Sequence, residues 1–117
     1  MDIRRGEIYW VDWSPGRGHE QLGTRPALII QNDVGNQTSL TTIVAACTTA
    51  QIDEPYPFIV QLTPQESGLK KNCIVNLAHI MTIDKQCLKD KCGQLNKSKM
   101  TQIDKAIEAS LGLRKAD

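Results

Sequence analysis

The stretch from Arg17 to Pro26 holds the side chains best suited to chemistry, because it places arginine, histidine and carboxylate groups directly before an apolar run. Arg25 ends this polar stretch, and Thr48 ends a second apolar run further along the chain. A guanidinium offers five N–H donors in a planar fork that matches phosphate, and a threonine hydroxyl can donate to another phosphate oxygen. Arg25 and Thr48 are therefore candidates for holding a phosphate group.

Two buried strands would bring these two side chains together. The runs 26–31 and 42–48 are short and mostly apolar, which is typical of strands buried on both faces. If they pair antiparallel, Arg25 at the start of one lies beside Thr48 at the end of the other. The residue types alone leave an alternative open, in which Arg25 forms an ion pair with Glu20 on the surface and Thr48 is an ordinary strand residue.

The rest of the chain predicts a mainly β fold. Further strands are expected, from alternation and β-branched residues, at 7–13, 58–62, 73–77 and 80–83. Asn32–Asn36 is predicted as a turn, and 84–91 as one or two helical turns. Several short strands of this kind favour a small twisted barrel over a sandwich, since barrel closure removes sheet edges.

One amphipathic helix is predicted to close the chain. Its apolar residues recur at helical spacing, namely Met100, Ile103, Ile107 and Leu111. Asn96 or Ser98 can cap its start, and Gly112 stands at its end. The predicted fold class is therefore mainly β with a C-terminal helix.

Composition describes one small domain, residues 1–117, which is long enough to bury a core. No apolar run approaches the roughly 18 residues of a membrane span, and the N-terminus lacks the apolar region of a signal peptide, so a cytoplasmic protein without a membrane partner is expected. The net charge of +1 excludes a uniformly basic nucleic-acid-binding surface. The charge is nevertheless uneven: residues 1–60 hold four Arg or Lys against seven Asp or Glu, and residues 61–117 hold ten against six. Any nucleic-acid site must be local.

The cysteines and tryptophans have mainly structural interpretations. The four cysteines form no C-x-x-C pair, so reduced, buried thiols are expected, with no metal and no cofactor. Trp10 and Trp13 offer a stacking platform for a nucleic-acid base, or they belong to the core or to a dimer interface.

The chain resembles a known protein family, the MazF/PemK toxins. The resemblance covers nearly the whole chain in collinear order, through segments 5–12, 18–21, 23–36, 42–48, 68–71, 80–85 and 109–113. It implies an SH3-like small barrel of the CcdB/PemK type with a C-terminal helix, active as a homodimer. It also implies a metal-independent endoribonuclease that cuts single-stranded RNA (mRNA) at short sequences, and a cognate antitoxin whose disordered C-terminal segment folds onto the toxin dimer.

The resemblance implies roles for particular residues. The family's catalytic positions fall on Arg25 and Thr48, and its Gly-x-Glu-Gln loop places Glu20 as the residue that orients Arg25 or accepts a proton. In the implied reaction a ribose 2′-hydroxyl attacks the adjacent phosphorus, leaving a 2′,3′-cyclic phosphate and a free 5′-hydroxyl. RNA contacts are expected from further polar side chains, namely Arg17, His19, Gln21, Lys70, Lys71 and His79. For Lys70 and Lys71 a solvated loop tip is the alternative.

Two departures from the family pattern concern the histidines. The chain has Gly18-His19-Glu20-Gln21 where the family usually has Gly-Ser-Glu-Gln, and Ala78-His79 where many members have Glu-Gln. An imidazole titrates near pH 6.5, which suits proton transfer; the simpler interpretation is that His19 and His79 alter which RNA sequence is cut. Two other functions stay open: a non-catalytic gyrase-inhibiting toxin of the same fold, and a catalytically weak member that sequesters its antitoxin.

Overall fold

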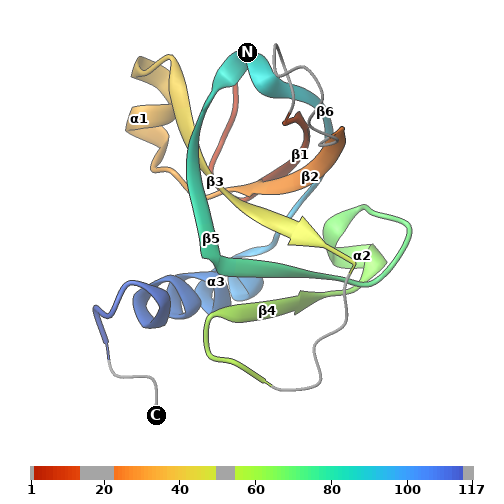
Figure 1. Ribbon diagram of the computed structural model, residues 1–117, viewed down its shortest axis with the longest axis vertical. Coiled ribbons are helices and arrows are strands. Elements are labelled where there is room, and N and C mark those ends of the chain that lie inside the picture. Colours follow the sequence, from red (N-terminus) through yellow and green to blue (C-terminus); the bar gives the residue numbers. More distant parts are fainter. Residues whose placement is uncertain (1, 14–22, 50–54, 115–117) are drawn as a thin grey trace.

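The computed structural model describes residues 2–13, 23–49 and 55–114, and a curled six-stranded antiparallel sheet forms its centre (Figure 1). The spatial order of the strands is β4-β5-β3-β2-β1-β6. Their bounds are β1 Glu7–Asp12, β2 Thr24–Ile29, β3 Thr41–Thr48, β4 Ile59–Leu62, β5 Cys73–Asp84 and β6 Leu88–Gln94. The helices are α1 Asp33–Thr38, α2 Pro64–Ser67 and α3 Lys97–Ser110, with a 3₁₀ turn, η1, at Lys85–Cys87. The predicted class, mainly β with a C-terminal helix, is confirmed.

The sheet is barrel-like but not closed by its edge strands. Within the described ranges β4 pairs only with β5, and β6 only with β1. The short helix α2 contacts both edge strands and lies between them. Thr63 and Glu66 form a capping box at its start, and Gly68 ends it in the left-handed conformation.

The two central strands are buried on both faces, as predicted. Along β2, Leu28 belongs to one hydrophobic cluster while Ala27 and Ile29 belong to the other, and along β3 the same alternation separates Ala45 from Val44. Side chains on a strand point alternately to opposite faces, so each central strand contributes to two cores. Their backbones are therefore held by packing from both sides.

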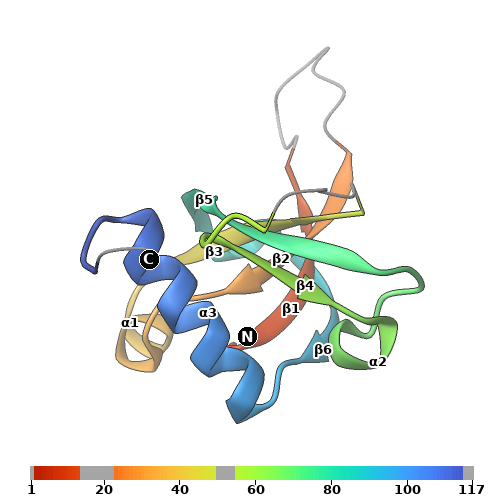
Figure 2. The same ribbon diagram turned by 90° about the horizontal axis from the view of Figure 1, so that it is seen from below.

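The C-terminal helix α3 covers the larger of the two clusters (Figure 2). Asn96 caps it by accepting from the Lys99 N–H at 2.8 Å, which confirms one of the two predicted caps. Ile103 and Ala106 are buried against the sheet. Leu111, predicted to extend the buried stripe, is 60% exposed.

Two local predictions were wrong, and a third was right only in part. Of the one or two helical turns predicted at 84–91, one forms, η1, and the chain then continues as β6, where Leu88 pairs with Val11. Asn32–Asn36 is not a simple turn: Asn32 caps the helix α1, and buried Asn36 accepts from Thr42 and Gln31. The strands predicted at 73–77 and 80–83 are one strand, β5, with a register shift inside it.

Trp10 and Trp13 lie in different surroundings. Trp10 is 37% exposed on β1, whereas Trp13 is partly buried and packs against the smaller cluster. All four cysteines are free, with Cys47 and Cys73 buried and Cys87 and Cys92 half-buried. No disulfide joins these cysteines in the structure, and only two of the four predicted buried thiols are fully buried.

Candidate functional site

Arg25 and Thr48 lie at the neighbouring ends of two paired strands. β2 and β3 pair antiparallel with Ala27 opposite Ala46 and Leu28 opposite Ala45, and the paired residues end at Ala27 and Ala46. Arg25 and Thr48 each lie two residues beyond that last pair, where the two strand ends diverge (Figure 1). Both belong to the same face of the sheet by alternation, and both are exposed. A guanidinium and a hydroxyl therefore stand on the ends of neighbouring strands, which together form one rim.

Both residues stand at the exposed ends of otherwise buried strands. Ala27 and Cys47, close to them in the chain, are buried. Cys47 is no competing nucleophile, because burial raises the pKa of its thiol well above the ordinary value. The rim thus carries polar groups on a backbone that the core holds in place.

His79 lies on a bulge of β5 beside this rim. Ala46 pairs with Asn76 and Ala45 with Ile80, so three residues of β5, Leu77 to His79, face a single step of β3. Such an insertion bends the strand and redirects its side chains. The side chain of Asn76 accepts from the Ala78 N–H at 2.9 Å and so supports the bulge. His79 is exposed.

Asn76 was not singled out from the sequence, although it positions His79. The signal was weak, since an asparagine within a strand-like run indicates a local backbone contact only when the bulge is already known.

Lys70 and Lys71 lie in the connection between α2 and β5. Ile74, near the start of β5, pairs with Thr48, so this connection enters β5 at the end of the sheet where Thr48 lies. Both lysines are exposed, and neither has an ion-pair partner within the described part of the chain. They are available to a negatively charged strand that passes the rim.

Four predicted site residues lie outside the described residues, namely Arg17, His19, Glu20 and Gln21. They belong to the connection 14–22 between β1 and β2. The described ends of that connection are joined by a hydrogen bond from the Trp13 N–H to the Gly23 carbonyl at 3.1 Å, two residues from Arg25. The chain therefore leaves and re-enters the sheet next to the rim.

Comparison with known proteins identifies the class to which this fold and rim belong. Residues 4–111 match the family of PemK-like, MazF-like toxins of type II toxin–antitoxin systems. The chain is 44% identical over 115 residues to the endoribonuclease MazF of Staphylococcus epidermidis, covering 98% of this chain and 96% of that protein. It is also 44% identical over 114 residues to the endoribonuclease EndoA of Bacillus subtilis (strain 168), covering 97% of each.

Solved structures agree with this assignment. A mycobacterial endoribonuclease in complex with its cognate antitoxin superposes with a TM-score of 0.80 at 27% identity, covering 97% of this chain and 99% of that one. A MazE–MazF complex from Deinococcus radiodurans, at 18% identity and a TM-score of 0.74 over 96% of this chain and 97% of that one, shares the fold. The chain belongs to the PemK/MazF toxin family. No helix in the described ranges is long and apolar enough to cross a membrane.

Proposed function

We propose that the protein is a sequence-specific endoribonuclease toxin that cuts single-stranded RNA at the Arg25–Thr48 rim. The observation that supports it is the antiparallel pairing of β2 and β3, whose neighbouring ends carry Arg25 and Thr48 on strands buried on both faces. The relatives at 44% identity are named endoribonucleases, so the gyrase-inhibiting alternative is not favoured.

The proposed reaction uses the nucleophile that RNA itself carries. The ribose 2′-oxygen attacks the adjacent phosphorus, the P–O5′ bond breaks, and the 2′-hydroxyl proton is removed while the leaving 5′-oxygen gains one. The products are a 2′,3′-cyclic phosphate and a 5′-hydroxyl, and no metal is required. DNA lacks the 2′-hydroxyl and should stay intact.

Arg25 would stabilise the negative charge that builds on the non-bridging phosphate oxygens, and Thr48 would donate to one of them. A guanidinium has a pKa above about 12 and is a poor proton shuttle, so we assign Arg25 an electrostatic role. Glu20 is the proposed partner that orients Arg25 or accepts the proton. Arg17, His19, Gln21, Lys70, Lys71 and His79 are the proposed RNA contacts.

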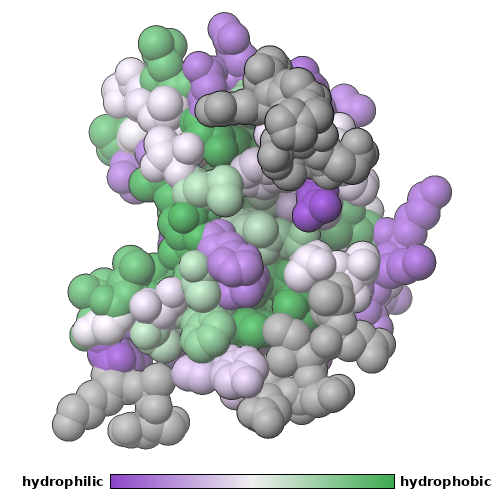
Figure 3. Space-filling view, in the orientation of Figure 1, coloured by the Kyte–Doolittle hydropathy of each residue, from purple (hydrophilic) through white to green (hydrophobic). Residues whose placement is uncertain are grey.

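The proposed assembly is a homodimer inhibited by a cognate antitoxin. Exposed apolar side chains gather over α1 and at the C-terminal end of α3, on the left margin of Figure 3, namely Val34, Leu40, Leu111 and Leu113. Met81 on β5 is 42% exposed. Large apolar side chains that are exposed close to one another are candidates for a protein interface. Light scattering should give twice the monomer mass, and Met81→Arg should shift it toward the monomer.

The decisive experiment incubates the purified protein with a long, weakly structured RNA in EDTA. Discrete fragments with 5′-hydroxyl ends are expected. Arg25→Ala should cut about a hundred- to a thousandfold more slowly, and Arg25→Lys should recover only part of the loss. RNA that stays intact would reject the proposal and would favour the alternative in which the protein sequesters its antitoxin. Inhibition of DNA gyrase by the same sample would favour the gyrase-inhibiting alternative.

A further inference from the structure

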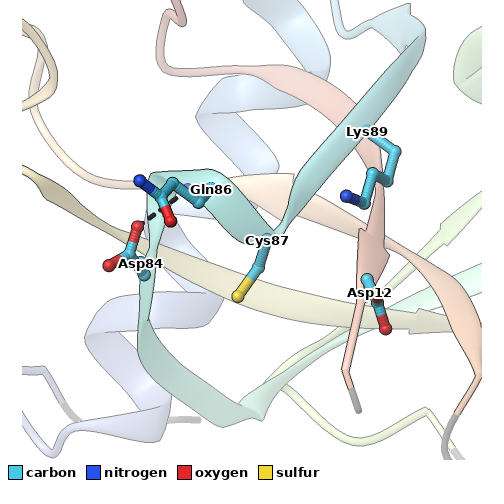
Figure 4. A pocket seen from close by; sticks show the side chains of 5 residues that line it. All are labelled: Asp12, Asp84, Gln86, Cys87 and Lys89. Carbon is cyan, nitrogen blue, oxygen red and sulfur yellow. Dashed lines mark hydrogen bonds between the residues drawn. The ribbon is translucent and has the colours of Figure 1, made fainter. Parts of the chain in front are cut away.

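A pocket of about 300 Å³ opens where β1 ends beside η1 and β6 (Figure 4). Its lining consists of Asp12 from β1, Asp84 at the end of β5, Gln86 and Cys87 from η1, and Lys89 from β6. In Figure 4 the sulfur of Cys87 lies between Asp84 on one side and Asp12 and Lys89 on the other. Its volume is at the lower end of the range for pockets that hold small molecules.

The lining groups combine acceptors with donors. Asp84 accepts from the Gln86 N–H at 2.8 Å and keeps further lone pairs. Lys89 has no hydrogen-bond or ion-pair partner within the described ranges. Two carboxylates disfavour a phosphate group. A planar heterocycle that carries both donors and acceptors on its edge matches this mixture better.

The pocket lies close to the proposed cleavage site. Asp12 pairs with Thr24, the residue before Arg25 on β2, and Val11 pairs with Leu88, the residue before Lys89 on β6. β2 and β6 are two strand spacings apart, which is about 10 Å. Asp12 and Arg25 occupy alternate positions and so project from opposite faces of the sheet, and an RNA strand bound at Arg25 would pass over the end of β1 to place a base in the pocket.

We infer that this pocket is a base-reading subsite that takes one unpaired nucleobase of the RNA cut at Arg25. The inference rests on the proposed function. The favoured base carries an amino group, as adenine, cytosine and guanine do and uracil does not. The Asp12 carboxylate accepts from that amino group, and Lys89 donates to a ring nitrogen or a carbonyl oxygen.

The first test compares cleavage of a random RNA pool by the wild type and by three variants. Lys89→Met and Asp12→Asn should lose about five- to hundredfold discrimination at one base position while still cutting. Lys105→Met, which removes the same charge from an exposed position on α3, should keep the wild-type preference. Unchanged preferences at every position in both pocket variants would overturn the inference.

The second test does not depend on cleavage. Cys87 is half-buried in the pocket, and trypsin releases it in its own peptide, residues 86–89, apart from Cys92. Iodoacetamide labelling of that peptide is measured with and without a 2′-O-methyl RNA, which lacks the nucleophile. Bound RNA, monitored by fluorescence anisotropy, should slow labelling about fivefold or more.

The outcomes separate the inference from the proposed function. A wild type that cuts no RNA, but whose Cys87 is shielded by the 2′-O-methyl strand, supports the base subsite and rejects the activity. Bound RNA that leaves the labelling rate unchanged overturns the subsite, as does an RNA that does not bind. A labelling rate that falls with rising protein concentration and does not respond to RNA also overturns the inference, because a second copy of the chain then covers the pocket.

Discussion

The ammonium nitrogen of Lys91 lies 2.9 Å from Oε2 of Glu7 and joins edge strand β6 to β1 across 84 residues of sequence. The Glu7 side chain is 7% exposed, and its other carboxylate oxygen accepts from the Arg4 N–H and the Tyr9 hydroxyl. A buried carboxylate that loses one of its donors retains much of its desolvation cost. The contact therefore stabilises the attachment of β6.

Lys91→Met should lower the free energy of unfolding by roughly 1–3 kcal/mol, because Glu7 stays buried with one donor fewer. Urea unfolding at pH 7 measures the change. Lys105→Met is the matched control and should stay within about 0.5 kcal/mol of the wild type. Equal midpoints for the two variants would show that the contact contributes nothing.

The Glu7 carboxylate should also make the free energy of unfolding depend on pH. Burial raises the pKa of Glu7, but hydrogen bonds from Lys91, the Arg4 N–H and Tyr9 outweigh it, and the net pKa lies below the ordinary value of 4.5. The folded state then binds fewer protons than the unfolded state, so the stabilisation is present above about pH 4.5 and is lost as the pH falls through the lowered pKa. Glu66 and Asp33, whose pKa values are also lowered, act in the same direction.

Glu7→Gln should accordingly be less stable at pH 7 and should lose less stability between pH 5 and pH 3 than the wild type. Each unit by which folding lowers the pKa of a carboxyl group corresponds to about 1.4 kcal/mol of stability. Thermal unfolding across that interval measures both effects. Parallel curves for the two proteins would contradict the assignment of Glu7.

Gly68→Ala should destabilise the protein by roughly 2–4 kcal/mol. Gly68 has a φ of +81°, and a Cβ there would stand 2.0 Å from the carbonyl oxygen of Cys92. Gly112→Ala is the control: its φ is +74° with nothing within 4 Å, so only backbone strain of about 1–2 kcal/mol is expected. Urea unfolding compares the two, and equal losses would show that α2 moves away from β6 at little cost.

His79→Gln should change which RNA sequences are cut and leave the pH dependence of kcat as it is. The bulge presents His79 near the rim, where we expect it to contact bases, whereas Arg25 is the residue proposed to stabilise the charge of the reacting phosphate. The pH–rate profile and the mapped cleavage sites are measured on the same RNA. Loss of one limb of the profile would instead assign proton transfer to His79.

The two strands that carry the rim could be predicted from the sequence. The runs that follow Arg25 and precede Thr48 are apolar enough to be buried on both faces, and antiparallel pairing brings the start of one strand toward the end of the other. The bulge at His79 could not be predicted, since it depends on how β5 slips against β3 and on one side-chain contact of Asn76.

β6 escaped prediction for a different reason. Leu88 is buried, but Lys89, Asp90 and Lys91 follow it with all three side chains exposed, so the segment lacks the alternation of a half-buried strand. Charged side chains are common on edge strands, where they oppose pairing with other chains. The pocket beside Lys89 was missed together with the strand that forms it.

The burial of β2 and β3 on both faces has a practical consequence for engineering. Arg25 and Thr48 stand on parts of the chain that tolerate little change, whereas positions 70, 71, 79 and 89 are exposed. Exposed substitutions usually alter stability by less than about 0.5 kcal/mol. These four positions carry proposed RNA contacts, so a combinatorial library there is expected to sample new RNA preferences while the folded scaffold persists.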